Sequence, residues 1–160
     1  MRRPVMVFSL AIAAVLTAAQ LSFAGFDEGE AAYHKRDYQT ALREWQPLAD
    51  TGDAEAQYKI GMMYRRGLGV KPDFHESAVW LLKAAEQGHG MAQARLARLL
   101  QDGKGIEKDV IEAYKWLILA VQNENPALEP VMLEVRSTLT AEQIAEAEAR
   151  AERWQPSHTD

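Results

Sequence analysis

Ten residues recur at an interval of 36 positions, and this internal repeat limits the fold more than any other feature of the chain. The first set comprises Gly52, Ala56, Gln57, Gly67, Gly69, Asp73, Glu76, Trp80, Leu81 and Ala84. The second set comprises Gly88, Ala92, Gln93, Gly103, Gly105, Asp109, Glu112, Trp116, Leu117 and Ala120. At the same interval Tyr38 precedes Phe74 and Ala49 precedes Ala85, so an earlier and more diverged unit comes first. A period of this length is typical of solenoids, in which each unit buries its apolar face against its neighbours.

Each unit is predicted to form two helices joined by a glycine-containing loop. The first helix has apolar or small side chains at helical spacing at Ala56, Ile60 and Met63, and the second has an equivalent stripe. Gly67 can adopt the left-handed conformation that ends a helix, and Asp73 is placed to cap the next helix with its carboxylate. No stretch alternates with the period of a β-strand, so we predict an all-α fold.

The C-terminal part predicts a helical cap for the stack. Thr140 and Gln143 have the spacing of a capping box, in which each side chain satisfies a free amide at the helix start. A solenoid needs a terminal element with a polar outer face, and we assign residues 127–154 to this cap as a helix pair. Pro126 and Pro130 leave the start of its first helix open, because proline past the first turn removes a backbone hydrogen bond.

Residues 1–24 have the layout of a secretory signal peptide. Arg2 and Arg3 are followed by an apolar, uncharged run, which ends in small residues before Gly25. We therefore expect export to the periplasm or the medium with cleavage before Gly25, although a start at Phe26 or Asp27 also fits. An uncleaved membrane anchor is less favoured because a bilayer span needs about 20 apolar residues. We thus expect no stable membrane insertion after cleavage.

Composition excludes several classes of function. The chain has no cysteine, which excludes disulfides, thiolate metal sites and a lipoprotein attachment site. Loss of residues 1–24 leaves 16 basic and 23 acidic residues, a formal charge of −7. An acidic surface argues against binding to nucleic acid, whose affinity comes mainly from cationic contacts to phosphate, and against charge-driven docking on anionic lipid.

The repeat resembles the Sel1-like repeat family, a branch of the tetratricopeptide-like solenoids. The resemblance rests on the run 56–64, on Gly67-Leu68-Gly69-Val70, on Asp73, Ser77 and Trp80, and on the run 84–88. The segment around Asp37 and Tyr38 resembles a tetratricopeptide-type entry unit. Ala97, Leu100 and Ser77 depart from the family pattern, which affects packing detail only. The resemblance implies a right-handed α-α superhelix of helix hairpins, with an entry unit at about 26–52, repeats at about 53–88 and 89–124, capping helices at about 127–154 and a loose tail at 155–160.

No combination of residues indicates catalysis, a cofactor or a metal. No two histidines are four residues apart on a predicted helix, and no serine follows the strand-turn-helix pattern of a nucleophile. Gly67-Leu68-Gly69 lacks the flanking strand of a phosphate loop, and no lysine-serine or lysine-threonine pair follows it. Trp80 and Trp116 repeat at equivalent positions, which favours packing between helices over a ligand cage. We therefore predict that the protein is not an enzyme.

A binding surface remains the best hypothesis for function. In tetratricopeptide-like stacks the first helix of each unit lines the concave face, and counting from Gly61 indicates which side chains point outward there. The predicted partner-binding residues are Tyr33, His34, Tyr58, Met62, Arg65, Arg66, Arg98 and Asp102. Aromatic residues, methionine and arginine are enriched at interfaces. A merely solvated face is the competing interpretation, since arginines are common on any exposed helix.

The resemblance implies an adaptor of the cell envelope that binds a peptide or protein partner. With two full repeats the groove is short, so we expect micromolar binding, or self-association through an uncovered end of the stack. A second hypothesis is an enzyme or accessory protein that binds peptidoglycan precursors or β-lactams, as some exported relatives do. Those relatives are typically cysteine-rich, which weakens this hypothesis. A purely structural spacer is a third.

Overall fold

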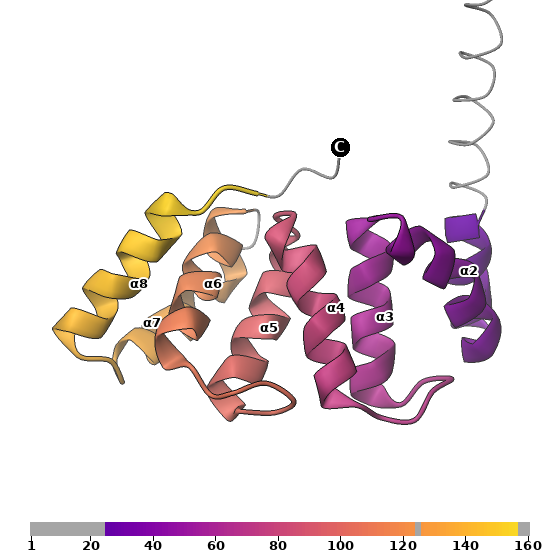
Figure 1. Ribbon diagram of the computed structural model, residues 1–160, viewed down its shortest axis with the longest axis horizontal. Helices are drawn as coiled ribbons and strands as arrows, with labels where there is room; N and C mark the ends of the chain where they lie inside the picture. Colours follow the sequence, from indigo (N-terminus) through magenta and orange to yellow (C-terminus); the bar gives the residue numbers. More distant parts are fainter. Residues whose placement is uncertain (1–24, 124–125, 157–160) are drawn as a thin grey trace, which may run out of the picture.

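The computed structural model describes residues 25–123 and 126–156, which form a row of antiparallel helix hairpins (Figure 1). Residues 25–34 are helical. They are followed by α2 (Tyr38–Asp50), α3 (Ala54–Arg66), α4 (Phe74–Glu86), α5 (Gly90–Asp102), α6 (Val110–Gln122), η1 (Pro126–Leu128), α7 (Glu129–Arg136) and α8 (Ala141–Arg153). All regular structure in these two ranges is helical, so the prediction of an all-α stack of hairpins is confirmed. The predicted signal peptide at residues 1–24 and most of the predicted tail lie outside the described residues.

The helix ends form where the repeated residues predict them. The carboxylate of Asp73 accepts hydrogen bonds from the backbone amides of His75 and Glu76, at 2.8 and 3.1 Å. Asp109 caps α6 in the same way, one repeat later. Gly67 and Gly103 end α3 and α5 in the left-handed conformation, with φ of 69° and 64°. The predicted aspartate cap at the start of the second helix and the predicted glycine at the end of the first helix are therefore both confirmed.

The long loops, residues 67–73 and 103–109, lie along one edge of the stack, and each joins the two helices of one repeat unit (Figure 1). Gly69 and Gly105 have φ of 71° and 70° and press against the first residue of a preceding helix. A Cβ atom on Gly69 would lie 2.8 Å from the backbone of Tyr38, and one on Gly105 would lie 2.1 Å from the backbone of Phe74. The nitrogen Nδ1 of His75 lies 3.0 Å from the carbonyl oxygen of Gly105. Each loop therefore docks directly on the backbone of the previous unit.

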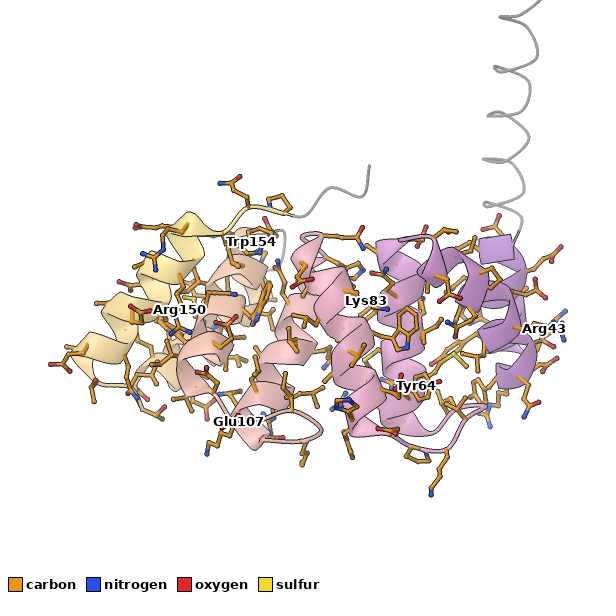
Figure 2. All side chains as sticks on the ribbon, viewed as in Figure 1. Arg43, Tyr64, Lys83, Glu107, Arg150 and Trp154 are labelled. Carbon is orange, nitrogen blue, oxygen red and sulfur yellow. The ribbon has the colours of Figure 1, made fainter. Side chains whose placement is uncertain are left out.

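Both repeated tryptophans pack between helices, as predicted. Trp80 and Trp116 retain 8% and 3% of their accessible surface. The ammonium group of Lys83 sits 4.0 Å from the centre of the Trp80 ring (Figure 2). Gly61 allows close approach of α3 and α4, because a Cβ atom there would lie 2.9 Å from the side chain of Leu81. Small residues at such contacts let the apolar stripes of adjacent helices interlock.

Buried glutamines connect the backbones of successive units. The amide nitrogen of Gln57 donates to the carbonyl oxygen of Ala49 at 3.0 Å, and Gln93 donates to Ala85 at 3.1 Å, 36 residues later. Gln87 in turn donates to the side-chain oxygen of Gln57 at 2.7 Å. Gln57 and Gln93 retain 4% and 0% exposure. Since a buried polar group requires a partner, these hydrogen bonds explain why glutamine recurs at this core position.

The cap consists of η1, α7 and α8, and it packs on α6. The capping box of Thr140 and Gln143 is present, which confirms the predicted start of α8. Pro130 is the second residue of α7, a position where proline is tolerated because its missing amide would have no helical partner. Arg150 extends from α8 to the carboxylate of Glu112 on α6, at 3.2 Å (Figure 2). In the described ranges, no helix has both the length and the apolar character needed to cross a membrane.

The loop docking predicts that Gly105→Ala destabilises the protein strongly. The new methyl group would collide with backbone atoms of Phe74, which cannot move aside as a flexible side chain can, and the residue would also be held in the left-handed region. We expect a loss of about 2–4 kcal/mol in the free energy of unfolding, measured by urea denaturation. Gly88→Ala is the matched control, because Gly88 has φ of 89° but the nearest atom would be 3.7 Å away. Equal losses in both variants would contradict the proposed docking.

Candidate functional site

Four of the predicted binding residues line one hollow where α3 and α5 end. Arg65, Arg66, Arg98 and Asp102 surround it, and Phe74, Leu99 and Lys104 complete the lining. The hollow has a volume of about 300 Å³. Neighbouring units place α3 and α5 with their C-terminal ends at the same edge of the stack. The fold thus brings together residues that are more than 30 positions apart in sequence.

The other predicted residues make contacts within the protein. Tyr33 packs against Tyr38 and Trp45, with ring centres 5.3 and 5.7 Å apart, and its hydroxyl accepts a hydrogen bond from Arg66 at 3.4 Å. The side chain of His34 lies 3.5 Å from that of Glu30. Tyr58 stacks on His89 at 4.8 Å between ring centres. The structure does not bring these three residues to the hollow, although Tyr33 positions one of its arginines.

The outward orientation predicted for Met62 is wrong. Its side chain retains only 8% exposure and belongs to the core. The buried arc of α3 includes Ile60, Gly61, Met62 and Met63, because α3 packs against both α2 and α4. A helix with neighbours on two sides buries a wider stripe than a surface helix. Met62 therefore offers little surface to a partner.

Arginines crowd one another around this hollow. Burial of its guanidinium lowers the pKa of Arg65, and the positive charges of Arg95, Arg66 and Arg98 lower it further. Arg95 was missed by sequence reasoning because a single arginine at a half-buried helix position carries no signal on its own. Its Nε is buried and has no hydrogen-bond partner in the part of the chain that the structure describes. We call Arg65, Arg66, Arg95 and Arg98 the arginine cluster.

One carboxylate counters this charge. Asp102 lies 3.3 Å from both Arg98 and Lys104. Partial burial opposes ionisation of Asp102, yet the hydrogen bond from Lys104 and the charge of Arg98 hold the pKa of this carboxyl below its ordinary value. Within residues 25–123 and 126–156, no ion pair involves Arg65, Arg66 or Arg95. The hollow therefore keeps a net positive charge on a chain whose formal charge is −5.

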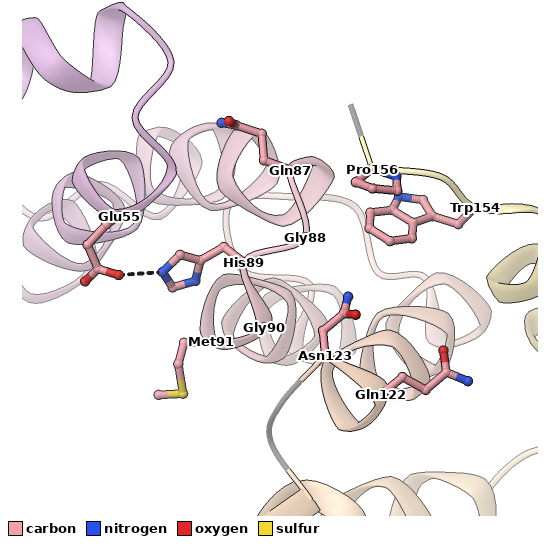
Figure 3. Close-up of a pocket in the computed structure, with 10 residues that line it drawn as sticks. All are labelled: Glu55, Gln87, Gly88, His89, Gly90, Met91, Gln122, Asn123, Trp154 and Pro156. Carbon is pink, nitrogen blue, oxygen red and sulfur yellow. Dashed lines mark hydrogen bonds and ion pairs between the residues drawn. The ribbon is translucent and has the colours of Figure 1, made fainter. Parts of the chain in front are cut away.

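A second and larger hollow of about 840 Å³ lies at the short turn between α4 and α5 (Figure 3). His89 and Glu55 border it on one side, and Trp154 and Pro156 border it on the other. The Nδ1 of His89 accepts a hydrogen bond from the amide of Ala92 at 3.1 Å, so its Nε2 carries the proton and donates to Glu55 at 2.8 Å. The histidine is thus a helix cap and an inter-repeat contact at once.

Among the described residues, no three histidine or carboxylate side chains are placed to hold a metal ion. Several acidic residues cap helices, as Asp73 does, or pair with basic side chains, as Glu112 does. The arrangement is suited to contact with a partner through charge and shape.

Comparison with known proteins agrees with the repeat seen in the sequence. The family described as Sel1 repeat matches the chain twice, over residues 54–89 and 90–125. Residues 54–125 of the chain are two Sel1 repeats. Its fold is similar to the crystal structure of a protective antigen present in uropathogenic Escherichia coli strains that displays an SLR fold. That match has a TM-score of 0.78 and 28% identity, and it covers 83% of this chain and 29% of the antigen.

Two further relatives carry the same repeat. A Sel1 repeat protein from Oxalobacter formigenes has a TM-score of 0.63 and 30% identity, with 79% of this chain and 54% of that chain covered. A putative sel1-like repeat-containing protein of Acanthamoeba polyphaga mimivirus is 44% identical over 39 residues, which are 24% of this chain and 7% of the viral protein. This chain therefore spans only about half of the length of one of the three relatives, and less of the other two.

The two Sel1 repeats differ in how their basic residues are neutralised. Lys59 of the first repeat lies 2.5 Å from Glu30 and 3.7 Å from Glu55. Arg95 occupies the equivalent position in the second repeat, and the equivalent of Glu55 is the uncharged Met91. The same helix position is thus ion-paired in the first repeat and unpaired in the second.

This crowding of like charges predicts that Arg65→Gln stabilises the Sel1 repeats. Glutamine is already accommodated at the equivalent position, Gln101, and its introduction removes repulsion from the arginine cluster. We expect the Tm to rise by about 1–2 °C at low ionic strength, and the gain to shrink in 0.5 M NaCl. Thermal unfolding followed by circular dichroism measures both. A fall in Tm would mean that Arg65 has a structural role.

The contact of Glu55 with His89 predicts a pH-dependent contribution to stability. The hydrogen bond from His89 is the main cause that lowers the pKa of Glu55, with Lys59 adding to it, while desolvation opposes the shift. A carboxyl whose pKa falls on folding stabilises the protein above its unfolded value of about 4.3 and loses that effect as the pH falls.

Glu55→Gln should therefore lower the Tm at pH 7 by no more than about 3 °C, because the group is partly exposed. The difference from the parent protein should vanish near pH 3. Glu86→Gln, which removes an exposed carboxylate without an ion pair in the described ranges, is the control. A Tm difference that is the same at pH 7 and pH 3 would contradict a role for the Glu55 charge.

Proposed function

We propose that this Sel1 repeat protein is a non-enzymatic adaptor of the cell envelope, which binds a peptide or protein on the exposed side of α3 and α5. Sel1 repeat proteins are typically protein-protein interaction modules, and the whole-protein role of the relatives is not carried over, since this chain spans only part of them. The signal-like pattern of residues 1–24 supports placement in the envelope or outside the cell.

The observation that supports this surface is the hollow at the ends of α3 and α5. Its cationic side chains lie beside Phe74, which is 40% exposed, so charged and apolar contact area occur together. Interface centres are typically built from such combinations of arginine and aromatic residues. Most other charged side chains of these helices are already paired, as Lys59 is with Glu30. A partner would therefore form its most favourable contacts at the hollow.

Capture of partners from an envelope extract tests this proposal. We expect the purified chain to retain specific proteins that a double variant, Arg66→Glu with Arg98→Glu, loses. Arg153→Glu is the matched control, because Arg153 is equally an exposed arginine in the last turn of a helix but lies on the cap, away from the hollow. Hydrogen exchange in the retained complex should show protection at the ends of α3 and α5.

Two outcomes would contradict the proposal. Equal capture by the double variant and the parent protein would place binding elsewhere, and protection on α8 alone would indicate the cap. The mass of the chain recovered from the envelope fraction should correspond to a start near Gly25, and recovery of the intact chain only from the cytoplasm would contradict the proposed location.

A further inference from the structure

The arginine cluster carries more charge than the protein itself neutralises. The lining of the hollow contains three guanidinium groups, those of Arg65, Arg66 and Arg98, and the ammonium of Lys104, against the single carboxylate of Asp102. Arg95 adds a further positive charge next to Arg65. From this imbalance we infer that the hollow binds a short acidic segment of the partner protein through aspartate or glutamate carboxylates. This inference rests on the proposed function and specifies the chemistry of its ligand.

The geometry favours carboxylates as the ligand. A guanidinium group presents a planar fork of donors that matches the two oxygens of a carboxylate. Arg66 uses one nitrogen for the hydroxyl of Tyr33 at 3.4 Å, and Arg98 uses its Nε for Asp102 at 3.3 Å. Each of these contacts uses only one nitrogen of the guanidinium group. Donors on both of these guanidinium groups therefore remain for an incoming acid.

The fold holds these arginines close together in the absence of a ligand. Arg65 and Arg66 come from the last turn of α3, while Arg95 and Arg98 come from α5. The helix C-terminus attracts positive charge, which supports Arg65 and Arg66 where they are. Repulsion between the two pairs remains, and a bound carboxylate would relieve it. Binding an acid therefore gains energy from new contacts and from reduced repulsion.

A protein segment fits the surroundings better than a nucleic acid or a membrane. The formal charge of the chain is −5, so a long polyanion that extends beyond the hollow would be repelled by the acidic remainder. The hollow of about 300 Å³ matches a few side chains and no extended track. Phe74 in its lining, which is 40% exposed, also offers an apolar contact that a phosphate backbone would not use. The expected segment therefore has an apolar residue between acidic ones.

A labelled peptide tests the inference directly. The probe is a fluorescein-labelled peptide with the core Asp-Glu-Leu-Glu-Asp, and its control has the core Asn-Gln-Leu-Gln-Asn, which keeps the shape and removes the charge. Fluorescence anisotropy with the purified chain should show binding of the acidic probe at micromolar concentrations. Affinity should fall steeply between 20 and 300 mM NaCl, because the contacts are largely exposed. The amide control should bind at least tenfold more weakly.

Variants taken from the other repeat keep the fold intact in this experiment. Arg65→Gln and Arg98→Met introduce the residues found at the equivalent positions Gln101 and Met62. Each should weaken the acidic probe by about two- to fivefold, the range expected for partly exposed pairs. Arg153→Gln on the cap should leave the affinity unchanged. A variant that binds more weakly while its Tm is unchanged or higher has lost a ligand contact and not its fold.

The possible results separate this inference from the proposed function. Equal affinity for the acidic and amide peptides, or unchanged affinity in the Arg65→Gln and Arg98→Met variants, would overturn the inference. Tighter binding of single-stranded oligothymidine or of phosphatidylglycerol vesicles at the same cluster would overturn it in favour of those ligands. If the Arg66→Glu and Arg98→Glu double variant loses protein partners while no acidic peptide binds, the adaptor function stands and the acidic ligand is wrong.

Discussion

The docking of each long loop on the backbone of the previous unit is the contact on which the rest of the stack depends. Gly69 presses on Tyr38, and Gly105 presses on Phe74 at the equivalent place one repeat later. Apolar burial between helices is strong but has no direction, and by itself it would allow neighbouring hairpins to slide or rotate. A backbone contact that admits no Cβ atom fixes the register. The alignment of α3 with α5 follows from it.

That alignment explains the electrostatics of the hollow. Two helices that end at the same edge of the stack bring their C-terminal ends together. Here Arg65 and Arg66 lie in the last turn of α3, and Arg98 lies just before the last turn of α5. The repulsion among them amounts to a fraction of the energy gained by burying residues such as Leu96 and Leu99, which are almost fully inaccessible. The core can therefore maintain a surface that is locally unfavourable. The same repeat geometry thus produces both the stable core and the crowded charge at its surface.

Much of the fold was predictable because its determinants are local. Asp73, Gly67 and Thr140 act on amides and dihedral angles within a few residues, and each forms the cap that its spacing predicts. The buried position of Met62 was not predictable from one helix, since it depends on α3 having neighbours on two sides. The role of Arg95 also depends on its surroundings, because the same position in the first repeat, Lys59, is fully paired.

The difference between these two equivalent positions shows where repeat proteins can differ without changing their fold. Core residues of one unit pack against the next unit, so a change at Trp80 or Leu81 would disturb two interfaces at once. An exposed ion pair contributes little to stability, and its loss in the second repeat is therefore compatible with the same hairpin. What changes is the electrostatic potential at the surface. Lys59 and its two glutamates together present no net positive charge, whereas Arg95 keeps its positive charge because the equivalent of Glu55 is Met91. Repetition supplies the scaffold, and arginines from both repeats, Arg65 and Arg66 from the first and Arg98 from the second, give one edge of it a distinct charge.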